Sequence, residues 1–250
     1  MPTGTSQGNK YQFIKKFVQC KLKLVFLYKF YLFYIFLYMQ ITKKEIKHNL
    51  IKASKELFLE KGYEAVSMRN IAERAKIGLS NIYNYVSSKE ELFRLIVQPV
   101  IQKLIKITEK NCDSEKIKTN INNSIDVEKS ENSYNFIEEI IKEYTHIIYK
   151  FRTEISILLF RAKGCTFETF KQDFSDRVTV VFKGYLNTLQ KMKNIKTKPV
   201  SDEFIHLHTI WILSLFEEVI LNDIRNEKLD NLINEYIKYE TMTWKEIIPC

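Results

Sequence analysis

The stretch Ala75–Lys89, AKIGLSNIYNYVSSK, decides the fold of this chain. It contains Gly78, one of only 6 glycines in 250 residues, and the glycine is followed by alternating apolar and polar residues. The segment before it predicts a helix of two turns over Ser67–Ala75, with Ser67 as the N-cap. A second short helix is predicted over Leu79–Tyr85. Two short helices joined by a turn that contains glycine form a helix-turn-helix, so we expect Gly78 to allow the sharp turn.

The two faces of the predicted third helix differ in chemistry. Ile82 and Val86 lie four residues apart, so we expect both to point inward against the preceding helix. The outward side then carries the short polar groups and a phenol of Ser80, Asn81, Tyr83 and Asn84. Amides and hydroxyls of this kind suit base edges and phosphates in the major groove of DNA. The same pattern also fits an ordinary surface helix, and the residues alone leave both interpretations open.

An amphipathic helix is predicted ahead of these two, over Lys43–Lys61. Its apolar residues recur at spacings of three and four and form one stripe: Ile46, Leu50, Ala53, Leu57 and Phe58. Thr42, with Glu45 three residues later, predicts a capping box at the start of this helix. Gly62 is predicted to end it in a left-handed conformation.

From Ile46 to Leu92 the sequence resembles the tetracycline-repressor-like (TetR/AcrR) family of bacterial regulators. The second helix carries SMRNIA, which is similar to the family pattern T/S-hydrophobic-x-x-I-A. Ile82–Leu92, IYNYVSSKEEL, resembles the signature L-Y-x-Y/H-F-x-S-K-E-x-L. The chain departs from the family at Lys76, usually Gly, at Val86, usually Phe, and at Gly78, often Ser. From these departures we predict that the turn is kept but shifted by two residues.

The resemblance implies an all-α fold, with an N-terminal three-helix helix-turn-helix domain and a larger C-terminal helical domain. It implies a homodimeric DNA-binding regulator, a repressor, which binds a palindromic double-stranded operator and is released by a small-molecule effector. Ser67 and Lys89 are expected at phosphates and Asn81 at bases. The full set of expected DNA contacts is Lys43, Lys44, Lys47, Ser67, Met68, Leu79, Ser80, Asn81, Tyr83, Asn84, Tyr85 and Lys89.

Composition agrees with an all-α protein that has a basic N-terminal end. With 6 Gly and 4 Pro the chain lacks the turn residues of an all-β fold. Residues 1–38 hold 6 Lys and no acidic residue, residues 39–90 carry a net charge of +4, and residues 91–250 carry −1. Such an asymmetry indicates contact with nucleic acid or a membrane surface. We predict a basic, apolar extension over 1–38, a DNA-binding domain over 39–90, and an effector-binding and dimerisation domain over 91–250.

The almost wholly apolar stretch Leu24–Met39 raises a membrane alternative. Its uninterrupted run, Phe30–Met39, has 10 residues, short of the roughly 20 that span a bilayer, and no small-residue cleavage site follows. We expect a cytoplasmic protein whose functional fold starts at Met39. A membrane-tethered regulator that uses residues 24–39 stays open, as does an all-α module whose polar helix contacts another protein.

The C-terminal part predicts helices at about 134–151, 153–163, 167–192, 202–224 and 228–247, after a long helix over Glu90–Lys110 that contains Pro99 and a polar loop over Asn111–Ser133. The helix at 202–224 is apolar around most of its circumference, and the last helix adds further apolar residues. We expect both helices to form a four-helix bundle with a second copy; packing of both in the core of a monomer is the alternative. An apolar or aromatic effector is expected between the middle helices. Its candidate wall residues are Phe136, Tyr144, Ile148, Phe160, Phe167, Phe170, His208 and Trp211.

The sequence offers no pattern typical of an enzyme. It lacks GxGxxG, GxxxxGK[ST], GxSxG and HExxH. His206 and His208 lie two residues apart, so on a helix their rings diverge and make a poor metal pair. The 4 cysteines are far apart and show no CxxC spacing. We therefore predict no catalytic residues, no metal and no cofactor.

Overall fold

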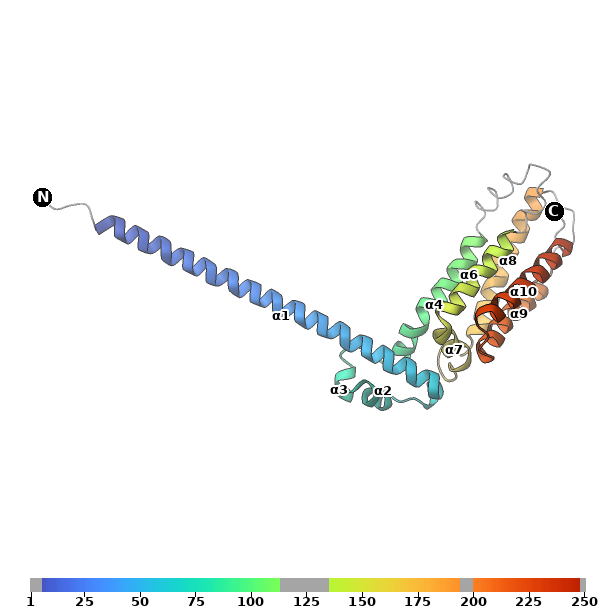
Figure 1. The fold of residues 1–250 in the computed structure, drawn as a ribbon, viewed down its shortest axis with the longest axis horizontal. Coiled ribbons are helices and arrows are strands. Elements are labelled where there is room, and N and C mark those ends of the chain that lie inside the picture. The colour runs from blue at the N-terminus through green and yellow to red at the C-terminus, as the bar shows by residue number, and fades with distance from the viewer. Residues whose placement is uncertain (1–5, 113–134, 194–199, 248–250) are drawn as a thin grey trace. The chain divides into compact units, whose positions relative to one another are not determined.

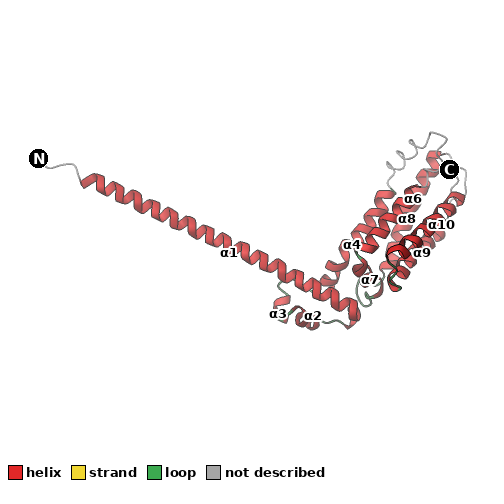
Figure 2. Cartoon of the chain, viewed as in Figure 1, coloured by secondary structure: helices red, strands yellow, loops and turns green. Residues whose placement is uncertain are grey.

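The fold is all-α throughout the described residues. The structure, a computed structural model, describes residues 6–112, 135–193 and 200–247, and within these ranges it contains helices and no strand (Figure 2). The chain divides into two compact units, Met1–Leu50 and Ile51–Cys250, which are considered separately. The helices are α1 Ser6–Ala65, α2 Met68–Ala75, α3 Leu79–Ile82, α4 Lys89–Asn111, α6 Asn135–Lys150, α7 Arg152–Phe160, α8 Phe170–Lys193, α9 Asp202–Leu221 and α10 Asn226–Ile247 (Figure 1).

The first unit consists of the N-terminal part of α1. Thr42 lies inside this helix, so the capping box predicted at Thr42 and Glu45 is wrong. A Thr-x-x-Glu pattern marks a helix start only where the preceding residues leave the helix, and here they continue it. The large apolar side chains of residues 28–36 are exposed, from 37% at Ile35 to 63% at Tyr28.

The end of α1 lies in the second unit and is set by Gly62. Ala53, Leu57 and Phe58 are buried, which confirms the predicted apolar stripe in this part of the helix. Gly62 adopts φ 78° and ψ 163°, a region that is essentially restricted to glycine. The expected positive φ is confirmed, although ψ places the residue outside the left-handed helical region.

The turn between α2 and α3 differs from the prediction. Lys76 takes the left-handed conformation, φ 57° and ψ 41°, directly after α2, whereas Gly78 has φ −61° and ψ 137°, which any residue adopts. A Cβ at Gly78 would meet nothing within 4 Å. The turn is therefore not shifted by two residues, and Gly78 is not what makes it sharp. The Ile77 amide donates to the Ala72 carbonyl at 2.9 Å and closes the end of α2.

The third helix is shorter than predicted. Regular helix ends at Ile82, and tight turns follow, with the Tyr85 and Val86 amides donating to the Ile82 carbonyl at 2.9 and 3.2 Å. These turns keep the side chains on the expected sides. Ile82 is 0% exposed and Val86 is 3% exposed, so the predicted inward face is confirmed.

The C-terminal body contains the helices that the periodicity predicts. Pro99 lies inside α4 without ending it. Helix α4 contacts α6 and α7, α6 contacts α10, and α8 packs along α9 (Figure 1). Most of the predicted loop Asn111–Ser133 lies outside the described residues.

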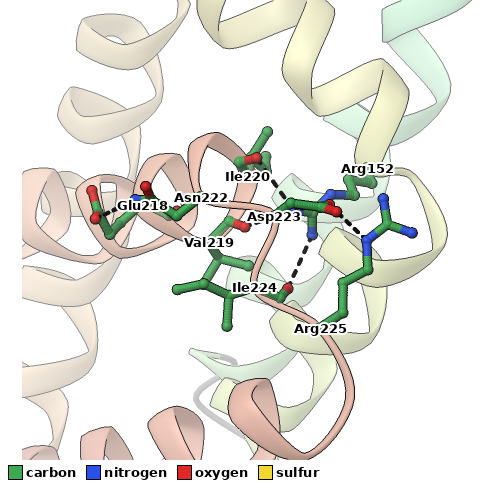
Figure 3. Close-up of polar contacts among 8 residues, drawn as sticks. All are labelled: Arg152, Glu218, Val219, Ile220, Asn222, Asp223, Ile224 and Arg225. Carbon is green, nitrogen blue, oxygen red and sulfur yellow. Dashed lines mark hydrogen bonds and ion pairs between the residues drawn. The ribbon is translucent and has the colours of Figure 1, made fainter.

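Arg152 holds the last turn of α9 in place. From the start of α7 its guanidinium donates to the carbonyls of Val219 at 2.6 Å, Ile220 at 3.2 Å and Ile224 at 3.4 Å (Figure 3). It also pairs with the Asp223 carboxylate at 3.1 Å. A helix C-terminus leaves its last carbonyls without helical partners. One side chain from α7 therefore adds hydrogen bonds to carbonyls in the last turn of α9 and in the turn that follows it.

The corrected turn predicts the effects of two substitutions that remove or introduce glycine. Lys76→Gly removes the steric cost of a left-handed side chain and should raise the free energy of unfolding by about 1 kcal/mol. Gly78→Ala places a methyl group in open space and should be neutral or slightly stabilising. Urea unfolding followed by circular dichroism measures both. If Gly78→Ala lowered the free energy of unfolding by more than about 1 kcal/mol, Gly78 would be required for the sharp turn after all.

Candidate nucleic-acid interface

Helix α2 is fixed at both ends by polar contacts. The Asn70 amide donates to the Ser67 hydroxyl at 3.2 Å, and the Ser67 amide donates to the Asn70 side-chain oxygen at 2.9 Å, which makes a reciprocal cap. The predicted N-cap at Ser67 is confirmed. Near the other end, Arg74 donates twice to the Glu60 carboxylate of α1, both bonds at 3.0 Å. This bidentate pair raises the pKa of Arg74 and lowers that of Glu60.

The polar residues of α3 and the turn after it face solvent. Ser80, Asn81 and Asn84 are exposed, and Tyr83 exposes 54% of its surface. Leu79 is also exposed, whereas Tyr85 is half-buried. The Asn84 side-chain nitrogen donates to the Asn81 side-chain oxygen at 2.9 Å. Hydroxyl and amide groups thus form the outer surface above the buried Ile82.

Lys89, at the start of α4, has its ammonium group directed inward. Nζ donates to the carbonyls of Tyr63 and Val66, both at 2.8 Å, and lies 4.0 Å from the centre of the Tyr63 ring. Burial lowers the pKa of this lysine. The phosphate contact that the resemblance implies for Lys89 stays a prediction, but two of its three ammonium hydrogens already serve the segment after Gly62.

Further cations and an apolar residue were expected beside this surface. In the first unit Lys43 and Lys44 are exposed and Lys47 is half-buried; in the second, Met68 is half-buried. Two exposed cations of the helix-turn-helix, Arg69 and Lys76, are absent from the predicted contacts. Arg69 follows Met68 directly, and Lys76 lies at the turn. Their positions within the helix-turn-helix could have placed both residues among the predicted DNA contacts.

The helix-turn-helix matches a known family model. Residues 50–96 match the model described as "Bacterial regulatory proteins, tetR family". Residues 50–96 thus form a TetR-family helix-turn-helix. Among curated proteins, the HTH-type transcriptional regulator YfiR of Bacillus subtilis is 25% identical over 84 residues, 34% of this chain and 41% of that protein. The HTH-type transcriptional activator FasR of Mycolicibacterium smegmatis is 32% identical over 66 residues, 26% of this chain and 30% of that protein. The matches therefore span less than half of either relative.

Solved structures share the fold of this chain over most of its length. NalD, the secondary repressor of the MexAB-OprM multidrug efflux pump in Pseudomonas aeruginosa, superposes with a TM-score of 0.55 at 17% identity, covering 80% of this chain and 95% of NalD. A TetR-like transcriptional regulator from Rhodococcus sp. RHA1 gives a TM-score of 0.52 at 16% identity, covering 82% and 97%. At these identities the likeness concerns the fold alone.

Contacts at both ends of the helix-turn-helix join it to the body. The Tyr63 amide donates to the Arg161 carbonyl, after α7, at 2.8 Å. Lys55 of α1 pairs with Glu154 of α7 at 2.6 Å. At the start of α4, the Glu90 carboxylate accepts hydrogen bonds from the amide and hydroxyl of Thr166. The segment between α7 and α8 is thus bound to the end of α1 and to the start of α4.

An aromatic cluster fills the space beside these polar contacts. The rings of Phe58, Tyr63 and Phe93 lie 5.3 to 5.7 Å apart, centre to centre. Phe167, from the segment between α7 and α8, packs against Phe93 at 5.7 Å. Phe167 was expected in the wall of the effector pocket; it packs at this junction, and its place in a pocket stays a prediction.

The other predicted pocket residues lie at several places in the body. Tyr144, Ile148 and Phe170 are buried and Phe160 is half-buried. The Tyr144 and Thr108 hydroxyls are 2.5 Å apart. The side chain of Phe136 lies outside the described residues. These placements leave the pocket a prediction.

The two pocket candidates of α9 face different surroundings. His208 lies 2.7 Å from the buried Glu240 carboxylate, to which Trp244 also donates at 2.9 Å. Trp211 is 56% exposed and meets Tyr239 of α10 edge-on at 6.3 Å. A half-exposed tryptophan fits contact with another molecule better than the wall of an enclosed pocket.

Glu90 predicts a pH-dependent stability of the junction. Burial opposes its ionisation, but hydrogen bonds from Thr166 and Tyr63 outweigh burial, and the net effect lowers its pKa below 4.5. A carboxyl whose pKa is lowered by folding stabilises the fold above its unfolded pKa, and this contribution is lost as pH falls through its folded pKa. The free energy of unfolding of the wild type should exceed that of Glu90→Gln by about 1 kcal/mol at pH 7. This difference in stability should shrink below about pH 4.

Thermal unfolding of both proteins between pH 3 and pH 7 measures this difference. The exposed Glu235→Gln serves as the control that removes a carboxylate from the body surface. A stability difference between wild type and Glu90→Gln that stays the same across this pH range would contradict the assignment of ionised Glu90 to the junction.

Proposed function

We propose that this TetR-family protein is a DNA-binding transcriptional regulator that binds a palindromic operator as a homodimer in the cytoplasm. The observation that supports DNA binding is the exposed polar surface of Ser80, Asn81, Tyr83 and Asn84, held outward by the buried Ile82. Side chains of this size and chemistry enter the major groove and bond both bases and phosphates. In a two-fold dimer, two such surfaces contact half-sites about 34–36 Å apart.

The proposed dimer uses α9 and α10. On α9 the exposed apolar residues Leu207, Trp211 and Leu221 recur at spacings that keep them on one side of the helix. On α10, Tyr239 and Met242 are 46% and 70% exposed. Large apolar side chains that gather on adjacent helices mark an interface. A second copy of the same surface would cover them and form the four-helix bundle.

The proposed effect on transcription is repression, relieved by a small apolar or aromatic effector in the C-terminal body. Similar proteins are named both as activators and as repressors of transcription: FasR as an activator and NalD as a repressor. A dimer that occupies promoter DNA blocks polymerase unless it makes a further productive contact, so repression requires fewer assumptions. The effector would favour a body conformation in which the two helix-turn-helix units no longer fit their half-sites.

A membrane-tethered regulator is the second candidate, favoured by the exposed aromatic side chains between Tyr28 and Phe36. By length and composition, one described helix, α9, could cross a bilayer. Four of its apolar residues are nonetheless buried in the fold: Ile205, Leu213, Phe216 and Val219. Recovery of the native protein in the membrane fraction would support the tethered form, and recovery in the soluble fraction would support the cytoplasmic one.

DNA binding is tested with the duplex that flanks the protein's own gene and with Tyr83→Phe. Wild type should shift this duplex in a gel at a lower concentration than a scrambled duplex. Tyr83→Phe should weaken binding about tenfold, because the phenol can no longer donate to a phosphate. Tyr149→Phe, a similarly exposed tyrosine of α6 at 62%, is the matched control and should bind like wild type.

Binding that ignores sequence and follows net charge alone would reject the regulator and favour the protein-interaction module. Equal affinity of Tyr83→Phe and wild type for the operator would instead reject only the phosphate contact of Tyr83.

The dimer surface is tested with Trp211→Glu. A carboxylate at the centre of the proposed bundle would be buried without a partner, so the dimer should weaken at least about tenfold in sedimentation equilibrium. Val180→Glu is the matched control, since Val180 is 72% exposed on α8, which is not one of the two helices of the proposed interface. An unchanged mass distribution in Trp211→Glu would place the interface elsewhere.

A further inference from the structure

The hydrogen bond between Asn81 and Asn84 joins two side chains of the exposed polar surface. The Asn84 nitrogen donates to the Asn81 oxygen at 2.9 Å, and both residues are exposed. They lie three positions apart, across the end of α3, with the buried Ile82 between them. Neither side chain is held by burial. Their mutual bond is what restricts their rotamers.

This bond determines which groups are left for a ligand. It occupies one hydrogen of Asn84 and one lone pair of the Asn81 oxygen, so the groups that stay wholly free are the two Asn81 amide hydrogens and the Asn84 oxygen. Reversing both amides exchanges the roles of the two residues. Reversing a single amide would break the bond. In either bonded arrangement one amide nitrogen and one amide oxygen of the pair are wholly free.

We propose that Asn81 and Asn84 act as one unit that selects adenine in each operator half-site. This inference rests on the proposed function. In the major groove adenine offers an acceptor at N7 and a donor at N6, which matches the pair. Guanine offers acceptors at both N7 and O6, and its O6 would oppose the free oxygen of the pair. The bond fixes the two amides in advance, so less rotamer freedom is lost when a base is bound.

The unit differs from two asparagines that act independently. A single asparagine offers both its donor and its acceptor to adenine, so two independent asparagines would specify two positions. Here one group of each amide is engaged by the other residue, and only the two together present a wholly free donor group and a wholly free acceptor. Truncating either residue should therefore abolish the preference at one and the same base pair. Truncating both should cost little more than truncating one, because the groups depend on each other.

The experiment selects bound sequences from a randomised duplex library with wild type, Asn81→Ala, Asn84→Ala and the double variant, all as full-length protein. Wild type should prefer A·T over G·C about tenfold or more at one position of each half-site. Each variant should reduce that preference below about threefold and leave the other positions unchanged. Asn187→Ala, which truncates an exposed asparagine of α8, is the matched control and should keep the preference. Thermal unfolding checks that all variants stay folded.

The outcomes separate this inference from the proposed function. If wild type selects no sequence at all, the regulator itself is rejected. If wild type selects an operator and the two single variants keep the preference, the unit is rejected and the regulator stands. Loss of preference at two different positions would show that the asparagines act independently, which also overturns the unit.

Discussion

The burial of Ile82 and Val86 is the constraint on which the candidate site depends. Helix α3 has only 4 residues, too few to be stable without tertiary contacts. Its orientation is therefore set by the two side chains that it buries. A rotation by one residue would place the Asn81 amide where Ile82 lies, and an amide buried without a partner costs at least about 2 kcal/mol. The same two residues that stabilise the turn thus determine which groups face solvent, and mutual bonding of Asn81 and Asn84 then limits how those groups are arranged.

Local patterns predicted the parts of the fold that depend on near neighbours. The cap at Ser67, the inward side of the third helix and the helices of the body all follow from residues within a few positions of each other. The turn shows where such reasoning fails. Gly78 attracted the steric role because glycine tolerates positive φ, but the amide of Ile77 bonds the Ala72 carbonyl and fixes the left-handed position at Lys76. The hydrogen bond that closes the end of α2 offsets the strain of a left-handed lysine at position 76. The sequence shows neither this hydrogen bond nor the strain.

Contacts between distant residues account for what the sequence could not predict at the candidate site. Lys89 bonds carbonyls that lie 26 and 23 residues earlier in the chain, at Tyr63 and Val66. A lysine beside a recognition segment is therefore also a structural residue, which its position in the motif does not reveal. The same holds for His208, whose partner Glu240 is 32 residues away. A side chain with such a partner must give up that hydrogen bond, or share it, before it can bind an effector or a phosphate.

The segment between α7 and α8 gives the body two points of attachment to the helix-turn-helix. Through the Arg161 carbonyl it is bound to Tyr63, just beyond Gly62, and through Thr166 it is bound to Glu90 at the start of α4. If α4 were the only connection, a change in the body would displace only the end of the helix-turn-helix that joins α4. With both attachments, a displacement of this segment acts on the end of α1 and on the start of α4 together. If the body moves on effector binding as proposed, a helix-turn-helix held at both places would move as one piece, with Ile82 and Val86 still buried while its polar surface changes position.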